Sequence, residues 1–156
     1  MKKIILDFSK PIENIKVTEN TVIYGLFIDV AHLTCQNSPC IVFSKNNISL
    51  DINVKAVINA NCVFDFSPIL KVSTKQKGIV ANLRINVLNN SSNSIIKSTP
   101  AMEIKQPDVS VSHSLAISSF DKNQLTYLCS RCLNKKEAEQ ILINSFISDI
   151  MKATKN

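Results

Sequence analysis

Hydrophobic and polar residues alternate strictly through the middle of the chain, and this pattern predicts β-strands. Every even-numbered position from Ile48 to Phe66 is apolar, while most of the odd-numbered positions between them are polar. A period of two is typical of a strand with one buried face and one solvated face. The run covers 19 residues, which exceeds the length of an ordinary strand. We therefore expect the chain to bend near 59–61.

Two shorter alternations predict further strands of the same kind. The apolar positions are Val22, Tyr24, Leu26, Ile28 and Val30 in the first, and Ile79, Ala81, Leu83, Ile85 and Val87 in the second. Clusters of Asn, Ser and Pro separate these runs, and asparagine favours turns because it tolerates left-handed backbone and bonds its own chain. Because the sequence has only two glycines, we expect asparagine to occupy several turn positions.

Many short strands without helices between them are typical of a sandwich, a barrel or a β-helix. No repeat of fixed length stands out along the chain, although such a repeat is the usual sequence signature of a β-helix. The residue pattern alone therefore leaves these three architectures open.

The period changes after Val111, beyond which the chain has no valine. Asp121 is placed as a helix N-cap, and the apolar face that follows comprises Leu125, Leu128, Cys129 and Cys132. A second helix is predicted at once, since Asn134 and Glu137 have the spacing of a capping box. Its apolar stripe comprises Ala138, Ile141, Leu142, Ser145, Phe146 and Ile150. We predict two short helices joined around 133–134.

Length and composition indicate one globular domain. With 156 residues, 45% hydrophobic and 19% charged, the chain is neither disordered nor membrane-like. No apolar run reaches the roughly 20 residues that span a bilayer, and Asp7 interrupts the apolar start before it resembles a signal peptide. We therefore expect a cytoplasmic protein without a membrane partner. Its five cysteines, odd in number and irregularly spaced, are expected to be free thiols.

The net charge of +6 is spread along the chain, with no basic run longer than two residues. A nucleic-acid-binding protein usually concentrates such charge on one element. A helix-turn-helix over 122–142 is one alternative, but its second helix would carry Glu137 and Glu139, which repel phosphates. We therefore expect no nucleic-acid partner. Since no phosphate-binding glycine loop, catalytic carboxylate pair or Ser-His-Asp arrangement is apparent, we also expect no enzymatic activity.

Several motifs near the C-terminal end occur in a characteristic order. A Thr-Pro-Ala-Met-Glu-Ile stretch at 99–104 precedes Asp108 and the Ser-His pair ending at His113. Residues 121–146 then contain Leu-x-Tyr-Leu-x-Ser-Arg, followed by Glu-Ala and finally by Phe146. This combination resembles the C-terminal part of the SufB/SufD family of iron–sulfur cluster assembly scaffolds. The resemblance implies a shortened right-handed parallel β-helix over 1–120 and a helical subdomain over 121–156.

The Ser-His pair resembles the SufD type, because the Glu-His-Glu typical of SufB-type members is absent. No counterpart of the SufB-type catalytic cysteine lies at the expected distance before it. The resemblance implies a non-enzymatic subunit that assembles iron–sulfur clusters with a SufB-type partner, or a second copy of itself, and a SufC-type ABC ATPase. It implies no permanently bound cofactor, although a transient iron–sulfur cluster is expected. The alternative is an adaptor that docks the ATPase without cluster chemistry.

The resemblance also gives roles to particular residues. His113 matches a histidine at the subunit interface that is implicated in cluster formation, and neutral imidazole is a good iron ligand. The residues implied to contact partner proteins are Tyr127, Arg131, Glu137 and Phe146. A purely structural alternative is that Leu128, Leu142 and Phe146 pack the helices onto the β core.

The cysteines invite separate interpretations. Cys129 and Cys132 form a Cys-x-x-Cys pair, but they lie inside a predicted helix on its apolar face, so we expect both to be core residues. Cys62 occupies an inward position of the long alternation and is also expected in the core. Cys35 and Cys40 flank a turn and are the thiols expected to be accessible.

Two residues depart from the family pattern. Ser114 and Cys132 stand where the family usually has glycine, and they fit only if the backbone avoids positive φ or the turn has changed. The chain is also far shorter than typical members, which is compatible with a reduced or split homologue. His32 has no motif around it and is expected to be an ordinary loop or strand-end residue.

Overall fold

The structure, a computed structural model that describes residues 1–8, 10–28, 34–59 and 61–155, consists of parallel strands followed by two helices. In chain order the strands are β1 (Lys2–Leu6), β2 (Ile15–Val17), β3 (Thr21–Ile28), β4 (Thr34–Asn37), β5 (Cys40–Phe43), β6 (Ser49–Ile58), β7 (Val63–Phe66), β8 (Ile69–Val72), β9 (Ile79–Asn89), β10 (Ile95–Lys97), β11 (Ala101–Ile104) and β12 (Val109–Ser118). The helices are α1 (Lys122–Ser130) and α2 (Lys135–Lys155).

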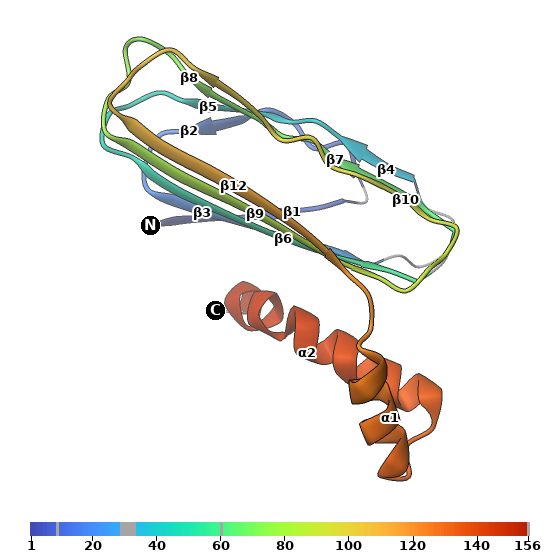
Figure 1. Ribbon diagram of the computed structural model, residues 1–156. Coiled ribbons are helices and arrows are strands. Elements are labelled where there is room, and N and C mark those ends of the chain that lie inside the picture. Colours follow the sequence, from blue (N-terminus) through green and yellow to red (C-terminus); the bar gives the residue numbers. More distant parts are fainter. Residues whose placement is uncertain (9, 29–33, 60, 156) are drawn as a thin grey trace.

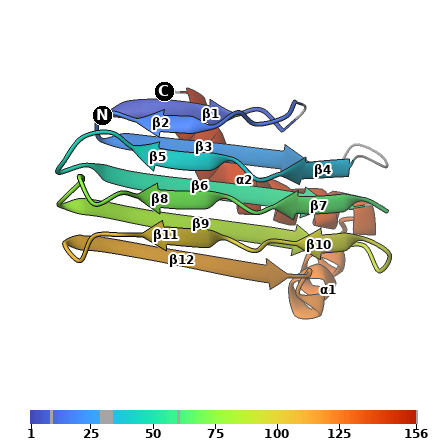
Figure 2. The ribbon, with the colours of Figure 1, turned by 90° about the horizontal axis from the view of Figure 1, so that it is seen from above.

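The strands wind into a parallel β-solenoid. The long strands form a five-stranded sheet, sheet A, in the order β1-β3-β6-β9-β12, and the short strands form two smaller sheets, β11-β8-β5-β2 and β10-β7-β4. Figure 1 shows the flattened coil, and Figure 2 shows its turns stacked in chain order. Paired residues on neighbouring strands of sheet A are about one solenoid turn apart in the sequence. Thr21 pairs with Leu50, 29 residues later, and Ser49 pairs with Val80, 31 residues later. The predicted β-helix core with a helical pair is confirmed.

The inward-facing residues of successive turns stack to form the core. The alternation predicted from Ile48 to Phe66 is confirmed, because its described even-numbered residues are all buried. β6 ends at Ile58 and β7 begins at Val63 in a different sheet, so the chain bends where expected. Ala60, a further member of the predicted alternation, lies outside the described residues.

β3 is apolar on both faces, which corrects the predicted orientation of its residues. Its inward residues pair with inward residues of β6, as Ile23 does with Ile52. The series beginning at Val22, predicted to face the core, lies on the opposite face, and its last member, Val30, is outside the described residues. That face is apolar because α2 covers it, and Leu26 packs there against a cluster that includes Ile143 and Ile147 of the helix.

Asparagine occupies several turn positions, as the scarcity of glycine predicts, and its side chains also link successive turns of the solenoid. The side-chain oxygens of Asn14, Asn20 and Asn46 accept hydrogen bonds from backbone N–H groups of the following turn at 2.8, 2.9 and 3.0 Å. Asn47 adopts a positive φ of 54°, and Gly78, stacked on it in the next turn, adopts 64°. A Cβ atom at Gly78 would collide with the Asn47 side chain, so glycine is required at this turn.

A proline stands directly before each of the strands β5, β8 and β11. These are Pro39, Pro68 and Pro100, which lie 29 and 32 residues apart. Their ring fixes φ and removes an N–H donor, which suits a corner where the chain leaves one sheet for another. The carbonyls of Pro39 and Pro68 accept hydrogen bonds from Ile69 and Ala101 at 2.9 and 3.0 Å. This spacing is the repeat signal that the sequence analysis missed.

Phe8 closes the N-terminal end of the solenoid. Its ring centroid lies 6.0, 6.1 and 5.5 Å from those of Phe27, Phe64 and Phe66, in edge-on or tilted arrangements that favour aromatic pairs. Gly25 leaves room for the ring, since an added Cβ would lie 2.9 Å from its Cε2 atom. The core therefore ends in an aromatic cluster on this side.

Both helices begin at the predicted capping residues. The Asp121 carboxylate accepts a hydrogen bond from the N–H of Asn123 at 2.8 Å. Asn134 and Glu137 form the reciprocal capping box, at 2.8 and 3.0 Å. The second helix has 21 residues and is longer than predicted, because its apolar side continues along sheet A.

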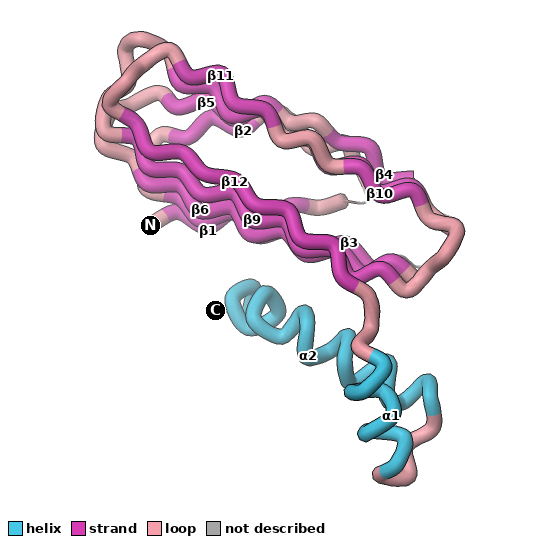
Figure 3. The backbone as a smooth tube through the Cα atoms, in the orientation of Figure 1, coloured by secondary structure: helices cyan, strands magenta, loops and turns pink. Residues whose placement is uncertain are grey.

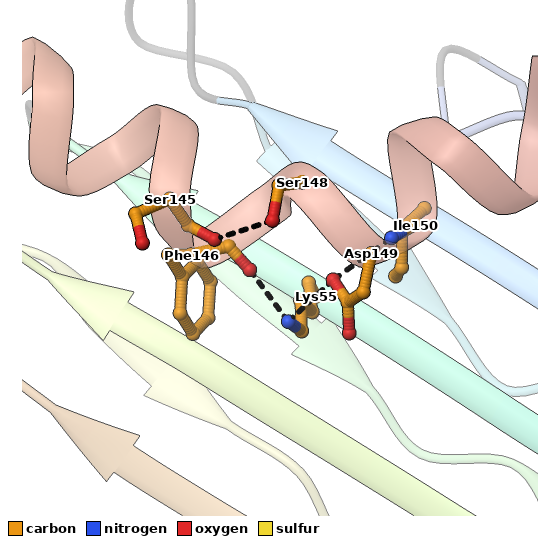
Figure 4. Close-up of polar contacts among 6 residues, drawn as sticks. All are labelled: Lys55, Ser145, Phe146, Ser148, Asp149 and Ile150. Atoms are coloured by element: carbon orange, nitrogen blue, oxygen red, sulfur yellow. Dashed lines mark hydrogen bonds and ion pairs between the residues drawn. The ribbon is translucent and has the colours of Figure 1, made fainter.

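α2 lies along the outer face of sheet A, as Figures 1 and 3 show, and Lys55 of β6 fixes it there. The Lys55 amine donates hydrogen bonds to the Phe146 carbonyl at 2.5 Å and to the Asp149 carboxylate at 2.7 Å (Figure 4). It also lies 4.8 Å from the centroid of the Phe146 ring. The Lys55 side chain is only 17% exposed, so this contact places the helical pair firmly against the solenoid.

Candidate functional site

The C-terminal end of the solenoid is open. β12 is the edge strand of sheet A and pairs only with β9 among the described strands (Figure 2). Its core-facing residues are in register with buried residues of β9, and they are Val109, Val111, His113, Leu115 and Ile117. They lack a covering turn, and Ile117 is consequently 52% exposed. The end of the hydrophobic core thus lies at the surface.

His113 lies in the middle of this open end. It is in register with Leu83, which is in register with Ile52, and Ile52 with Ile23. Three buried isoleucine and leucine side chains are therefore followed, in the last turn, by an exposed imidazole. It is the one polar side chain in an otherwise apolar row on β12, and imidazole nitrogen is in general a common ligand of iron.

The apolar neighbours of His113 were missed by the sequence analysis. The signal was available, because Val109, Val111, Leu115 and Ile117 alternate through the segment and place His113 in the same series. The opposite face of β12 consists mostly of serines, and there Ser112 Oγ donates a hydrogen bond to Asn82 Oδ1 at 2.7 Å.

No three His, Cys, Asp or Glu side chains come close enough to hold a metal ion within the described residues. His113 therefore belongs to no group of three such side chains in the described part of the chain. His32, the other histidine, lies outside the described residues. Neither described helix is long and apolar enough to cross a membrane.

Cys35 is not the accessible thiol that was predicted. It is 2% exposed in β4, and Asn37 Nδ2 donates a hydrogen bond to its sulfur at 3.4 Å. Burial raises the pKa of the Cys35 thiol, the Asn37 hydrogen bond opposes this, and the Asp65 carboxylate raises it again. Cys40, at the start of β5, is half-buried. Cys62 is buried, as predicted.

The prediction that Cys129 and Cys132 are core residues was wrong, because both are exposed. α1 buries none of its nine residues completely, so its apolar side faces a groove rather than the core. Cys132 follows the helix with a φ of 65°, whereas Ser114 lies within the regular strand β12. The serine therefore fits an extended backbone, while the cysteine occupies a left-handed position that favours glycine.

Replacing Cys132 with glycine should stabilise the protein by about 1 kcal/mol. The left-handed backbone costs a residue with a Cβ about 1–2 kcal/mol. Part of that gain is offset because glycine loses more conformational entropy on folding. Urea denaturation of the reduced protein would measure the change. Ser114→Gly is the matched control, and it should destabilise by about 0.5–1 kcal/mol because its backbone is extended. Equal shifts in both variants would contradict the argument.

A largely apolar groove runs between the two helices. It has a volume of about 420 Å³, and its lining residues include Tyr127, Leu128, Ile141 and Leu142. Tyr127 is 58% exposed, and the Arg131 guanidinium carbon lies 5.3 Å from its ring centroid. This pair forms an exposed cationic and aromatic rim.

The other two residues expected to contact partners have contacts within the chain. Glu137 is exposed, but its carboxylate caps the start of α2. Phe146 is half-buried, and it packs against a cluster that includes Val57 and Leu88 while its ring faces Lys55. These residues position the helical pair, whereas Tyr127 and Arg131 are freely exposed.

Comparisons with known proteins identify the family of this chain. A family model for the SUF system FeS cluster assembly, SufBD core domain, matches residues 18–146. The iron–sulfur cluster assembly protein SufD of Escherichia coli is 31% identical over 61 residues, which cover 39% of this chain and 14% of that protein. SufB of Bacillus subtilis is 26% identical over 106 residues, which cover 68% of this chain and 23% of that protein.

A SufBD family protein of Mycobacterium leprae is 26% identical over 107 residues, covering 69% of this chain and 12% of that protein. The chain thus spans less than a quarter of the length of these curated relatives. The family model, by contrast, covers most of the chain, including the solenoid from β3 onward and both helices as far as Phe146. The chain therefore belongs to the SufBD family of iron–sulfur cluster assembly proteins.

Proposed function

We propose that this protein is a non-enzymatic, SufD-like subunit that assists iron–sulfur cluster assembly together with a SufB-type subunit. The observation that carries the proposal is the position of His113, a metal-ligating side chain at the centre of an open, apolar end of the solenoid. The SufD-like assignment rests on the Ser-His pair that ends at this residue, in place of Glu-His-Glu.

The open end is suited to a second solenoid. The free edge of β12 presents backbone N–H and C=O groups that favour pairing with another strand. Its exposed apolar residues, Leu115 and Ile117, would be buried by the same contact. A SufB-type subunit is the proposed occupant, and a second copy of this chain is the alternative. In either assembly His113 lies at the interface.

His113 would contribute one ligand to a cluster that is cargo rather than a resident cofactor. Iron–sulfur clusters generally take four protein ligands, so the partner subunit would supply the remainder. A neutral imidazole binds iron without carrying a charge into the apolar interface. The surrounding valine, leucine and isoleucine side chains would limit access of water to the cluster.

The groove between α1 and α2 is the proposed docking site for a SufC-type ATPase. Its apolar lining with the exposed Tyr127 and Arg131 at its rim is typical of a protein interface, where aromatic residues and arginine are enriched. Glu137 and Phe146 would act indirectly, by holding the helices that form the groove. Because the groove is formed without His113, an adaptor that only docks the ATPase is the second candidate function.

Anaerobic co-purification with the SufB-type subunit and the ATPase tests the proposal. In the His113→Ala variant we expect the complex to persist, and its iron and sulfide content to fall by about tenfold or more, a loss typical of metal-site variants. His113 is exposed, so the substitution should not disturb the fold. Ser112→Ala, on the opposite face of β12, is the control and should retain iron and sulfide.

The three outcomes separate the alternatives. Loss of iron and sulfide in the His113 variant alone supports the scaffold. An intact complex that is indifferent to both substitutions supports the adaptor. If neither the SufB-type subunit nor the ATPase is retained, both functions are refuted.

A further inference from the structure

Cys129 and Cys132 lie together at the exposed corner between α1 and α2. α1 ends at Ser130, and the N–H of Cys132 donates a hydrogen bond to the carbonyl of Cys129 at 3.2 Å. Such a four-residue turn brings its first and last Cα atoms within about 7 Å, and disulfides span Cα separations of about 4.4–6.8 Å. Cys129 belongs to the last turn of α1 and Cys132 lies beyond its end, so the backbone after Ser130 retains freedom to close the remaining gap.

The other three cysteines are separated from this pair. Cys35 and Cys62 are buried in the solenoid, and the half-buried Cys40 begins β5. β5 belongs to the wall of the solenoid opposite sheet A, whereas the helices lie outside sheet A (Figure 1). The corner thiols are therefore the two exposed thiols among the described residues, and each is the nearest in sequence to the other.

We propose that Cys129 and Cys132 form a reversible redox pair, which closes to a disulfide by exchange with a small disulfide such as glutathione disulfide. One thiol loses its proton and attacks the oxidant, which forms a mixed disulfide and releases one glutathione. The second thiol then loses its proton and attacks the protein sulfur of that mixed disulfide, which releases the second glutathione. Two protein thiols are oxidised and one glutathione disulfide is reduced to two thiols.

Closure of the pair would fix the end of α1. Tyr127 and Leu128 line the helical groove and immediately precede Cys129, so the oxidised corner holds one wall of that groove in place. Amide hydrogen exchange over residues 128–134 should therefore slow on oxidation. The pair itself follows from the thiol exposure and the turn, and it does not depend on the proposed assembly function.

Arg131 lies between the two cysteines and allows a direct test. Trypsin cleaves after Lys122, Arg131 and Lys135, so Cys129 falls in the peptide 123–131 and Cys132 in the peptide 132–135. The folded, reduced protein is equilibrated anaerobically with glutathione and glutathione disulfide at graded ratios. It is then alkylated, digested and analysed by mass spectrometry. We expect the two peptides to be replaced by one disulfide-linked species, and dithiothreitol to restore them.

Mixing unlabelled protein with ¹⁵N-labelled protein before oxidation distinguishes links within one chain from links between chains. The proposal requires linked peptides that are wholly light or wholly heavy. Cys132→Gly, which keeps the left-handed turn, should instead carry one glutathione on the peptide 123–131. Mixed light and heavy links, separate glutathione adducts on both wild-type peptides, or unchanged thiols in excess glutathione disulfide would each overturn the proposal.

Discussion

Replacing Phe8 with alanine should lower the free energy of unfolding by about 3 kcal/mol, the lower end of the range for truncating a phenylalanine in a core. The ring contacts three other phenylalanines at the N-terminal end of the solenoid, Phe27, Phe64 and Phe66. Its removal leaves a cavity over that cluster. Since Phe8 itself is half-buried, part of the cavity would admit water, and the cost should stay at the low end.

Urea denaturation followed by circular dichroism would measure this loss. Ile5→Ala is the control, because Ile5 is 57% exposed on β1, and it should change stability by no more than about 0.5 kcal/mol. A similar loss in both variants would mean that truncation anywhere near this end is costly, and Phe8 would have no special role.

Gly25 provides a second check of the same contact. Gly25→Ala should destabilise the wild-type protein, because the added Cβ would lie 2.9 Å from Phe8 Cε2 and 3.1 Å from Val54 Cγ2. In the Phe8→Ala background the first of these clashes disappears, so the same substitution should cost less. Strict additivity of the two changes would contradict direct contact between the two residues.

Replacing Lys55 with alanine should destabilise the docked α2 by about 2 kcal/mol, which is typical of a hydrogen bond to a charged group. The half-buried amine donates a hydrogen bond to the Phe146 carbonyl and faces the Phe146 ring. The ion pair with Asp149 adds less, because that carboxylate is 66% exposed and screened by water. Lys55→Met keeps an apolar stem of similar length and removes the charged amine with its hydrogen bonds.

Amide hydrogen exchange of α2 is the measurement for the Lys55 variants. Exchange should accelerate in α2, while the solenoid core from β6 to β9 stays protected. Lys55→Met should accelerate exchange nearly as much as Lys55→Ala. If Lys55→Met behaves as wild type, the alkyl chain rather than the amine holds the helix.

The same contact predicts a dependence on pH. Burial raises the pKa of Asp149. Hydrogen bonds from Lys55 and from the Ile150 backbone, together with the positive charge of Lys55, lower the pKa by more than burial raises it, so the pKa lies below its ordinary value. A carboxyl group of this kind stabilises the fold above its unfolded pKa of about 3.9, and this contribution is lost as pH falls through the folded value. Asp149→Asn should therefore be less stable than wild type near neutral pH and equally stable in strong acid.

Local patterns in the sequence determined much of this protein. The alternation from Ile48 to Phe66 gave one buried face because the period of a strand is two. The capping residues Asp121 and Asn134 marked both helix starts, because a cap depends on residues within one turn of the helix. The ordered C-terminal motifs indicated the family, which the match over residues 18–146 established.

Contacts between distant segments decided the rest. β3 faces the core with Ile23 rather than Val22, because α2, more than a hundred residues later, covers its outer side. Cys129 is exposed because α1 meets α2 across a groove instead of packing on the core. Residue periodicity gives the apolar side of an element, but it does not give the neighbour that covers that side.

His113 combines both kinds of information. The sequence singled it out through its motif, but the residue pattern did not place it at the end of the apolar column Leu83, Ile52 and Ile23. That position follows from register between strands about thirty residues apart, which tertiary packing sets through the stacked turns. The sequence by itself determined the chemistry of this residue, and only the fold determined that it lies exposed at the open end of a hydrophobic core.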